Sequence, residues 1–285
     1  RDLAEMRRCV FDNKRTPRRF LQGRVFGVRP VGSGSAVVEV TRGTLRIMIQ
    51  ADDFFHFSQM KGIENDDDAT RQRRYLRKAK LMNGAIINFC PYMEAESEDG
   101  EVVFAGSRQD AMQIQRNRHF FGRNADVKNG SRAAASILST GPDYVIAEAL
   151  GVETSIGAAA LSAYEYIDNV AEKYHVGDGI PVVVEDLHVD AENGTVSLRL
   201  NRAILERRAN PAMNIHSLAR GGAYGATVTS VNDRFYRLIV DSGNIQARVA
   251  LTSSDELLTR GDRVTLLVYG YDEKRNYVWG ACHKV

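Results

Sequence analysis

The chain has 285 residues, of which 44% are hydrophobic and 26% are charged. These proportions are ordinary for a folded protein of two or three domains. The sequence contains no apolar run of about 18 residues, so it predicts no membrane-spanning helix. The formal net charge of +2 does not by itself favour nucleic-acid binding. Cys9, Cys90 and Cys282 are far apart and form no C-x-x-C pair, which argues against a disulfide framework or a zinc site. We therefore expect a cytoplasmic protein without a metal or other cofactor.

Three stretches of similar length share one pattern, in which a glycine opens an apolar strand and a turn leads to a second strand that ends on a basic residue. They are 84–108, 177–202 and 261–284. A repeat of this size usually means that one small fold is used several times in tandem.

The first repeat, 18–122, follows a basic segment at 1–17. Its expected strands are Gly23–Val28, Ala36–Thr41 and Leu45–Gln50. An insertion then carries a helix at about 70–82, and we interpret Asp66–Asp68 as the start of this helix rather than as a metal site, because carboxylates favour exposed N–H groups. A linker helix is expected at about 107–120.

The second repeat, 123–208, has expected strands at Ala135–Leu138 and Tyr144–Leu150, and Ala160–Ser162 aligns with the end of a third strand. Apolar residues at helical spacing predict a helix at 162–174, and a linker helix is expected at 202–209. The third repeat occupies 209–285 together with its linker, and its strands are expected at 222–231, 235–241 and 245–251.

Five short strands per repeat, with a longer connection between the third and the fourth, is the outline of an OB-type barrel. The predicted fold is therefore mostly β, with helical insertions and linkers, and consists of three tandem OB-fold, five-stranded β-barrels.

Two segments are rich in cations, 1–24 and 71–80, and the second contains no acidic residue. Clustered cations are typical of a phosphate-binding surface. A solvated helix face is the alternative. The sequence leaves both interpretations open for Arg73, Arg74 and Arg77.

Alternation along the strands predicts which side chains point outward. In the second repeat this rule leaves Arg199 outside, and in the third it leaves Tyr277 and Trp279 outside. Phe235 shares a face with Arg237, and Tyr144 shares one with the charged Glu148. An exposed aromatic side chain can be a stacking platform for bases. It can equally pack against a neighbouring repeat.

The second and third repeats resemble the S-one type RNA-binding domain, which is repeated in the largest protein of the bacterial small ribosomal subunit. The resemblance lies in Val176-Gly177-Asp178, Val189-Asp190, 196–202, Arg260-Gly261-Asp262, Tyr271-Asp272, His283-Lys284 and the aromatic residue of strand two. It implies OB barrels that bind single-stranded RNA through outer aromatic and basic residues of strands two, three and five. Where the family has a histidine or an aromatic residue at the end of strand three, this chain has Gln50, Ala160 and Ala250. This departure favours an interaction or structural role.

No enzyme motif is evident. The turn Gly32–Ser35 lacks the residues of a phosphate loop, the histidines are scattered, and His188 and Asp190 fit a turn better than a catalytic pair. We therefore predict non-catalytic binding of single-stranded RNA, associated with the ribosome or with messenger RNA. Single-stranded DNA is an alternative ligand, and a structural or adaptor protein of a phage or mobile element, with a protein partner, is the alternative function. The predicted nucleic-acid-binding residues are Tyr144, Arg199, Arg202, Phe235, Arg237, Trp279, Tyr277, Lys284, Arg73, Arg74, Arg77 and Arg108.

Overall fold

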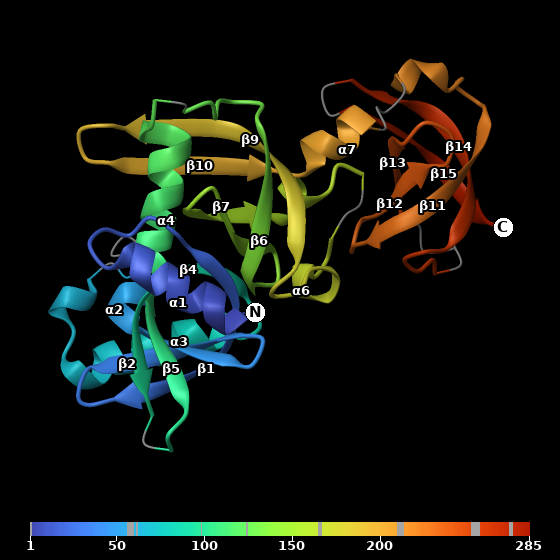
Figure 1. The fold of residues 1–285 in the computed structure, drawn as a ribbon. Coiled ribbons are helices and arrows are strands. Elements are labelled where there is room, and N and C mark those ends of the chain that lie inside the picture. Colours follow the sequence, from blue (N-terminus) through green and yellow to red (C-terminus); the bar gives the residue numbers. More distant parts are fainter. Residues whose placement is uncertain are drawn as a thin grey trace. The chain divides into compact units, whose positions relative to one another are not determined.

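The computed structural model describes residues 2–55, 60, 62–97, 99–123, 125–164, 167–209, 214–251, 257–273 and 276–285. The chain divides into two compact bodies. The N-terminal body comprises Arg1–Ile156 and Ala171–Leu200, and the C-terminal body comprises Gly157–Val170 and Asn201–Val285. Strands dominate both bodies, so the predicted mostly β class is confirmed (Figure 1).

The first repeat forms a closed barrel. Its strands are β1 (Leu21–Val31), β2 (Ser35–Arg42), β3 (Leu45–Gln50), β4 (Ile86–Glu96) and β5 (Val102–Ser107), in the order β1-β2-β3-β5-β4. Every neighbouring pair is antiparallel except β3 and β5, which run parallel and close the barrel. The alternation of apolar and polar residues positions the core, since Leu21 and Val25 are buried and Gln22 and Arg24 are exposed.

The third repeat forms a second closed barrel with the same strand order. Its strands are β11 (Ala223–Val231), β12 (Phe235–Val240), β13 (Ile245–Ala250), β14 (Arg263–Asp272) and β15 (Tyr277–Lys284). The parallel pair is again formed by the third and fifth strands, β13 and β15.

The second repeat keeps this order but its sheet is open. The strands are β6 (Arg132–Thr140), β7 (Tyr144–Ala149), β8 (Val152–Gly157), β9 (Gly179–Asp190) and β10 (Thr195–Asn201), in the order β10-β9-β6-β7-β8. At the seam between β8 and β10, the Thr154 hydroxyl donates a hydrogen bond of 2.8 Å to the Leu198 carbonyl. Two of the three sheets therefore form the predicted closed barrels, and the second is nearly closed. All three fit tandem OB folds.

The glycine that opens each repeated stretch has the same structural role in all three copies. Gly84, Gly177 and Gly261 have φ angles of +91°, +91° and +93°, a conformation that a residue with a Cβ rarely adopts. Each of these N–H groups donates a 2.8 Å hydrogen bond to the first strand of its repeat, at Val25, Ile137 and Val228 respectively. A β-bulge follows the same three acceptor residues, so the repeat extends to its backbone irregularities.

The helices agree with the predictions in part. The helices are α1 (Asp2–Asn13), α2 (Ala51–Phe54), η2 (Ile63–Asn65), α3 (Asp68–Leu81), α4 (Arg108–Arg116), the π-helical turn η3 (Asn117–Phe121), α5 (Ala158–Leu161), α6 (Val170–Lys173), α7 (Ala203–Ala209) and η4 (Ile215–Ser217). The helices expected at about 70–82, 107–120 and 202–209 are confirmed as α3, α4 with its π-helical turn, and α7. The predicted start of α3 is also confirmed, because Asp67 accepts a 2.6 Å hydrogen bond from the Thr70 N–H.

Two predictions for the second repeat are wrong. Its third strand is β8, Val152–Gly157, whereas Ala160 lies in α5. The single helix expected at 162–174 is not formed, since α5 ends before Ser162 and α6 starts at Val170. The Glu206 carboxylate of α7 accepts hydrogen bonds from the Ala163 N–H at 2.7 Å and the Ser162 hydroxyl at 2.9 Å. A backbone donor that a helix would use is thereby satisfied by a side chain.

Within the N-terminal body, the first barrel and the second sheet share part of their cores. Leu138 of β6 is buried in the same cluster as the interior of the first barrel. The Ser136 hydroxyl donates a 2.8 Å hydrogen bond to the Ile86 carbonyl of β4. Helix α1, in a region for which the sequence predicts only a basic segment, lies against this barrel (Figure 1). Its Met6 and Cys9 are buried in the same core cluster.

Candidate nucleic-acid interface

The outer face of the third barrel gathers several of the predicted site residues. Strands β12, β13 and β15 are adjacent, and their register places Arg237 opposite Arg248 and Arg248 opposite Trp279. Val249, Leu238 and Val278 alternate with these residues and are buried. The charged and aromatic side chains therefore lie together on the side of the sheet away from the core.

Aromatic rings and guanidinium groups alternate on this face. The Arg248 guanidinium carbon lies 4.3 Å from the Tyr277 ring centroid and 5.0 Å from that of Phe235. The guanidinium carbon of Arg237 lies 5.5 Å from the Phe235 centroid. These are cation–π distances. We refer to Phe235, Arg237, Arg248, Tyr277 and Trp279 as the aromatic–arginine strip.

Trp279 is held in place while part of its ring stays open to solvent. It is 47% exposed, and Tyr269 contacts it edge to face with centroids 6.1 Å apart. A Cβ added at Gly270 would lie 2.8 Å from the indole ring, so the absence of a side chain there lets the ring lie on the strand. Because the ring is already fixed, little side-chain conformational entropy is lost when a ligand stacks on its open face.

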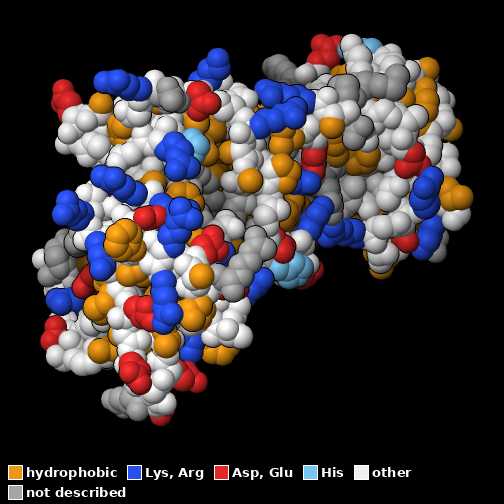
Figure 2. Space-filling model, viewed as in Figure 1, with side chains coloured by type: hydrophobic (Ala, Val, Ile, Leu, Met, Phe, Trp, Pro, Cys, Tyr) orange, Lys and Arg blue, Asp and Glu red, His pale blue; other side chains and the backbone are white. Residues whose placement is uncertain are grey.

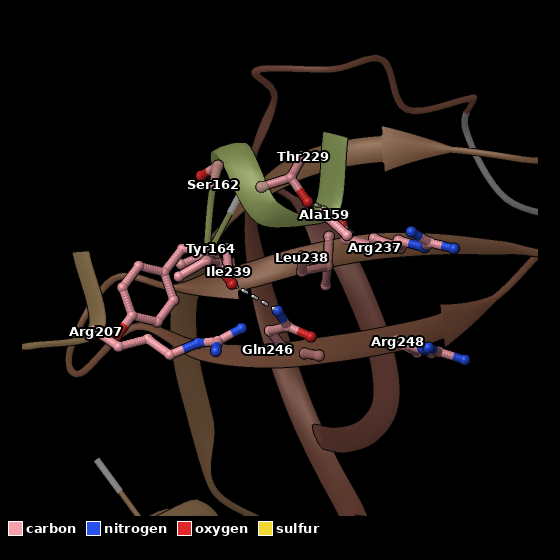
Figure 3. Close-up of a pocket in the computed structure, with 12 residues that line it drawn as sticks. Ala159, Ser162, Tyr164, Arg207, Thr229, Arg237, Leu238, Ile239, Gln246 and Arg248 are labelled. Carbon is pink, nitrogen blue, oxygen red and sulfur yellow. Dashed lines mark hydrogen bonds between the residues drawn. The ribbon is translucent and has the colours of Figure 1, made fainter. Parts of the chain in front are cut away.

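A pocket of about 220 Å³ lies beside the strip in the C-terminal body. Its lining comes from the β12–β13 face, from the segment around α5 and from α7, and it includes Tyr164, Arg207, Ile239 and Gln246. Figure 3 shows Tyr164 and Arg207 at one end of the pocket, whereas Arg237 and Arg248 extend from the other end. The Gln246 side-chain amide donates a 3.2 Å hydrogen bond to the Ala163 carbonyl.

In the second repeat the predicted residues are more dispersed. Tyr144 begins β7 and is 39% exposed, and a Cβ added at Gly141 would lie 2.6 Å from its ring. Arg199 is exposed on β10, with a guanidinium nitrogen 4.0 Å from a carboxylate oxygen of Asp186. Arg202 forms an ion pair with Glu206 and donates a 2.8 Å hydrogen bond to the Leu161 carbonyl.

Helix α3 divides its cations between internal pairs and solvent. Arg74 forms a 2.6 Å ion pair with Asp66, and Lys78 lies over the Phe55 ring and 3.8 Å from Glu153. Arg73 and Arg77 are exposed on one face of the helix because they are four residues apart. Only part of the cluster at 71–80 is thus available to a ligand.

The prediction that Arg108 contacts nucleic acid is wrong. Arg108 is 0% exposed, and its guanidinium donates to Glu148 at 2.5 and 3.1 Å, to Glu153 at 3.1 Å and to the Phe54 carbonyl at 3.1 Å. Burial opposes its charge, but the two carboxylates keep the Arg108 pKa above its ordinary value. The same contacts explain why Glu148, which shares a face with Tyr144, is buried.

The cations near the N-terminus and at the C-terminus also have internal partners. Arg7 donates to both carboxylate oxygens of Glu94 from its Nε at 3.0 and 3.1 Å, and Arg19 pairs with Asp12 at 2.8 Å. Lys284 lies 3.4 Å from Asp262. On the face that Figure 2 shows, Lys and Arg side chains are interspersed with acidic and hydrophobic ones rather than gathered into one patch.

The sequence interpretation missed Arg248, Arg207 and Tyr164. Arg248 was predictable from strand alternation, because the apolar Ile245, Ala247 and Val249 alternate with Gln246 and Arg248. The same rule predicts the outward-facing residues of β15. Arg207 and Tyr164 carried no such signal, since their place beside the β12–β13 face depends on how the connecting segments fold. Among the described residues, none of the helices is long and apolar enough to cross a membrane. That part of the chain also forms no group of three His, Cys, Asp or Glu side chains suited to a metal ion.

Comparison with known proteins gives no family assignment. No family model matches the chain, and no curated protein matches it. Several solved structures are similar over most of its length. A multidomain protein with nucleic acid binding domains from Streptococcus pneumoniae is 11% identical, with 92% of this chain and 72% of that chain covered and a TM-score of 0.22.

Two further structures are at the same level of similarity. The CSD456 segment of Drosophila Unr is 8% identical, with 94% of this chain and 97% of that chain covered and a TM-score of 0.19. The Ifi202 HINa domain in complex with a 20-base-pair double-stranded DNA is 9% identical, with 94% and 95% covered and a TM-score of 0.19. Function must therefore be argued from this chain's own residues.

Proposed function

We propose that this protein binds single-stranded nucleic acid, RNA in the first place, without catalysing a reaction. The observation that carries the proposal is the aromatic–arginine strip on β12, β13 and β15, in which planar cations alternate with aromatic rings. Bases stack on aromatic faces and on guanidinium planes, and arginine attracts the phosphates between them.

The strip also supports the resemblance to the S-one type domain. Phe235 and Trp279 lie on strands two and five, where that resemblance implies ligand contacts. The aromatic residue expected on strand three is replaced by Ala250, but Arg248 on the same strand lies between two rings and supplies another planar group. Binding of RNA at the ribosome or on messenger RNA, in the cytoplasm, is the setting that this resemblance favours.

The test is a titration of the purified protein with a short single-stranded RNA oligonucleotide at moderate salt. We expect the fluorescence of Trp279 to be quenched, because it is the only tryptophan and lies in the strip. Arg248→Ala should weaken binding by about 1–3 kcal/mol, the range for losing one stacking partner. Arg263→Ala, which removes an exposed arginine of β14 paired with Asp241, is the matched control and should bind like the wild type.

Absence of any quenching or electrophoretic shift with the wild-type protein would contradict the proposal. Equal losses in the two arginine variants would also contradict it, because the effect would then be one of charge and not of the strip. Repeating the titration with DNA of the same sequence distinguishes RNA from single-stranded DNA as the preferred ligand.

An adaptor function is a second candidate, and exposed aromatic side chains on the N-terminal body favour it. Phe11 and Phe26 are 70% and 67% exposed, and the Lys14 ammonium lies over the Phe11 ring, 5.6 Å from the ring centroid. Large apolar rings exposed to this extent can mark an interaction surface. Under this alternative, Phe26→Ser would change self-association or partner binding, measured by sedimentation velocity, and leave the RNA titration unchanged.

A further inference from the structure

The pocket beside the strip combines an apolar floor with a polar rim. Ala159, Ala163 and Ile239 supply apolar surface, while the Tyr164 ring, the Gln246 amide and the Arg207 guanidinium supply groups that can stack or donate hydrogen bonds (Figure 3). This is the usual composition of a small-molecule site, in which a few polar groups orient a ligand on an apolar surface.

Charge restricts what this pocket can hold. No acidic residue is among the lining residues in the described part of the chain. Arg207 is exposed, and among the described residues no carboxylate lies within ion-pair distance of its guanidinium. A guanidinium with no ion-pair partner among the described residues, beside an apolar floor, favours a ligand that carries both a flat apolar part and an anionic group.

Size restricts it further. About 220 Å³ is less than the roughly 300–1,000 Å³ of pockets that enclose drug-sized ligands. The space is suited to one planar ring system. The remainder of a larger ligand would have to lie outside, along the open side of the pocket.

The position of the pocket connects it to the strip. Arg237 and Arg248 belong to both, because both line the pocket and their guanidinium groups lie near the rings of Phe235 and Tyr277 respectively. A strand stacked on the strip would therefore pass the mouth of the pocket.

We propose that this pocket receives a single nucleobase turned out of the bound strand, with Tyr164 and Gln246 at the base and Arg207 at an adjacent phosphate. The inference rests on the proposed function, since the strip supplies the rest of the strand's contacts. A free mononucleotide offers the same chemistry and is the alternative source of the base.

The experiment uses the full chain and fills the pocket. Ala159 is exposed and lines the pocket, so Ala159→Phe should occupy it without disturbing the core. Ala209→Phe, an identical change at an exposed position of α7 outside the lining, is the matched control. Thermal unfolding followed by circular dichroism verifies that both variants are folded.

Each protein is titrated with a single-stranded RNA oligonucleotide and with a set of the same oligonucleotide in which one abasic nucleotide is moved along the chain. For the wild type and Ala209→Phe, we expect one abasic position to weaken binding about fivefold or more, the lower range for loss of one stacked base. Ala159→Phe should weaken binding of the intact oligonucleotide by a similar factor and abolish this position dependence, while Trp279 quenching persists.

A titration with adenosine and uridine monophosphates distinguishes the two sources of the base. Saturable binding that Ala159→Phe abolishes, without an abasic effect in the oligonucleotide, would overturn the strand-bound base and assign the pocket to a free nucleotide. If Ala159→Phe binds every ligand like Ala209→Phe, the pocket proposal is refuted although the strip still binds RNA. If the wild type binds no oligonucleotide, the proposed function fails and the pocket proposal fails with it.

Discussion

The buried cluster around Arg108 offers a sharp test of how the N-terminal body is held together. Arg108 follows β5 of the first repeat, and its partners Glu148 and Glu153 lie on β7 and β8 of the second. Both carboxylates are almost fully buried. Arg108→Met keeps a chain of similar length but leaves two carboxylates and the Phe54 carbonyl without this donor.

Removing one member of a buried ion pair typically costs about 3–5 kcal/mol, because the remaining charge is left uncompensated in a poorly solvated site. We expect a loss of this size in the free energy of unfolding of the N-terminal body. Arg108→Met combined with Glu148→Gln should recover part of it, since one of the two buried charges is then removed.

The assay is urea unfolding monitored in two ways. Hydrogen exchange of β7 peptides reports on the N-terminal body, and Trp279 fluorescence reports on the C-terminal body, where the only tryptophan lies. The exchange of β7 should become faster, while the fluorescence midpoint should stay unchanged. Arg7→Met, which breaks an exposed pair with Glu94, is the control and should have little effect. If Arg108→Met is no more destabilising than Arg7→Met, the cluster does not hold the body together.

Three further predictions concern titration, thiol reactivity and salt. Hydrogen bonds from Ala163, Ser162 and Arg202 outweigh the burial that would raise the Glu206 pKa, so this pKa is lowered from 4.5. The stabilisation that results is complete above about pH 4.5 and is lost as the pH falls through the folded-state pKa. Between pH 6 and pH 3.5, the melting temperature of the wild type should therefore fall further than that of Glu206→Gln. Burial raises the pKa of the Cys90 thiol to about 12 and also raises that of Cys9. A thiol reagent at pH 8 should therefore label Cys282 first, as followed by mass spectrometry. Equal labelling rates would contradict the buried placement of Cys9 and Cys90. If α3 contacts phosphates, Arg73→Ala with Arg77→Ala should flatten the log–log salt dependence of RNA binding by about 1.4, at about 0.7 per contact, whereas an unchanged slope would leave this helix face solvated.

The repeat was predictable because the backbone requires it. The opening glycines adopt φ angles near +90°, so the same residue type recurs at Gly84, Gly177 and Gly261, and the alternation of each strand follows from one buried face. The N-terminal helix was missed although Met6, Cys9 and Asn13 are buried at helical spacing. Its many cations make the segment look basic in the sequence, because some of their carboxylate partners are distant along the chain. Glu94, the partner of Arg7, is one of them.

The site was predictable only where strand alternation decides it. Alternation places Phe235, Tyr277 and Trp279 correctly on the outer face of the third barrel. It could not place Arg108, because the partners that bury this residue lie 40 and 45 positions further along the chain. In the second repeat, alignment by residue type moved the end of the third strand from Val152–Gly157 to Ala160–Ser162, since Ala160-Leu161-Ser162 resembles Ala250-Leu251-Thr252 of the third repeat.

The basic residue that closes each repeat shows how a shared sequence feature can have a structural cause. Arg108 is held by Glu148 and Glu153, Arg202 by Glu206, and Lys284 lies near Asp262. In all three repeats, the cation at the end of the last strand therefore has a carboxylate of the protein itself as its partner. Arginine beside aromatic rings is a different situation, because the guanidinium face remains usable for stacking. Under the proposed function, nucleic-acid affinity should consequently depend on Arg248 and its rings more than on the number of cations in the chain.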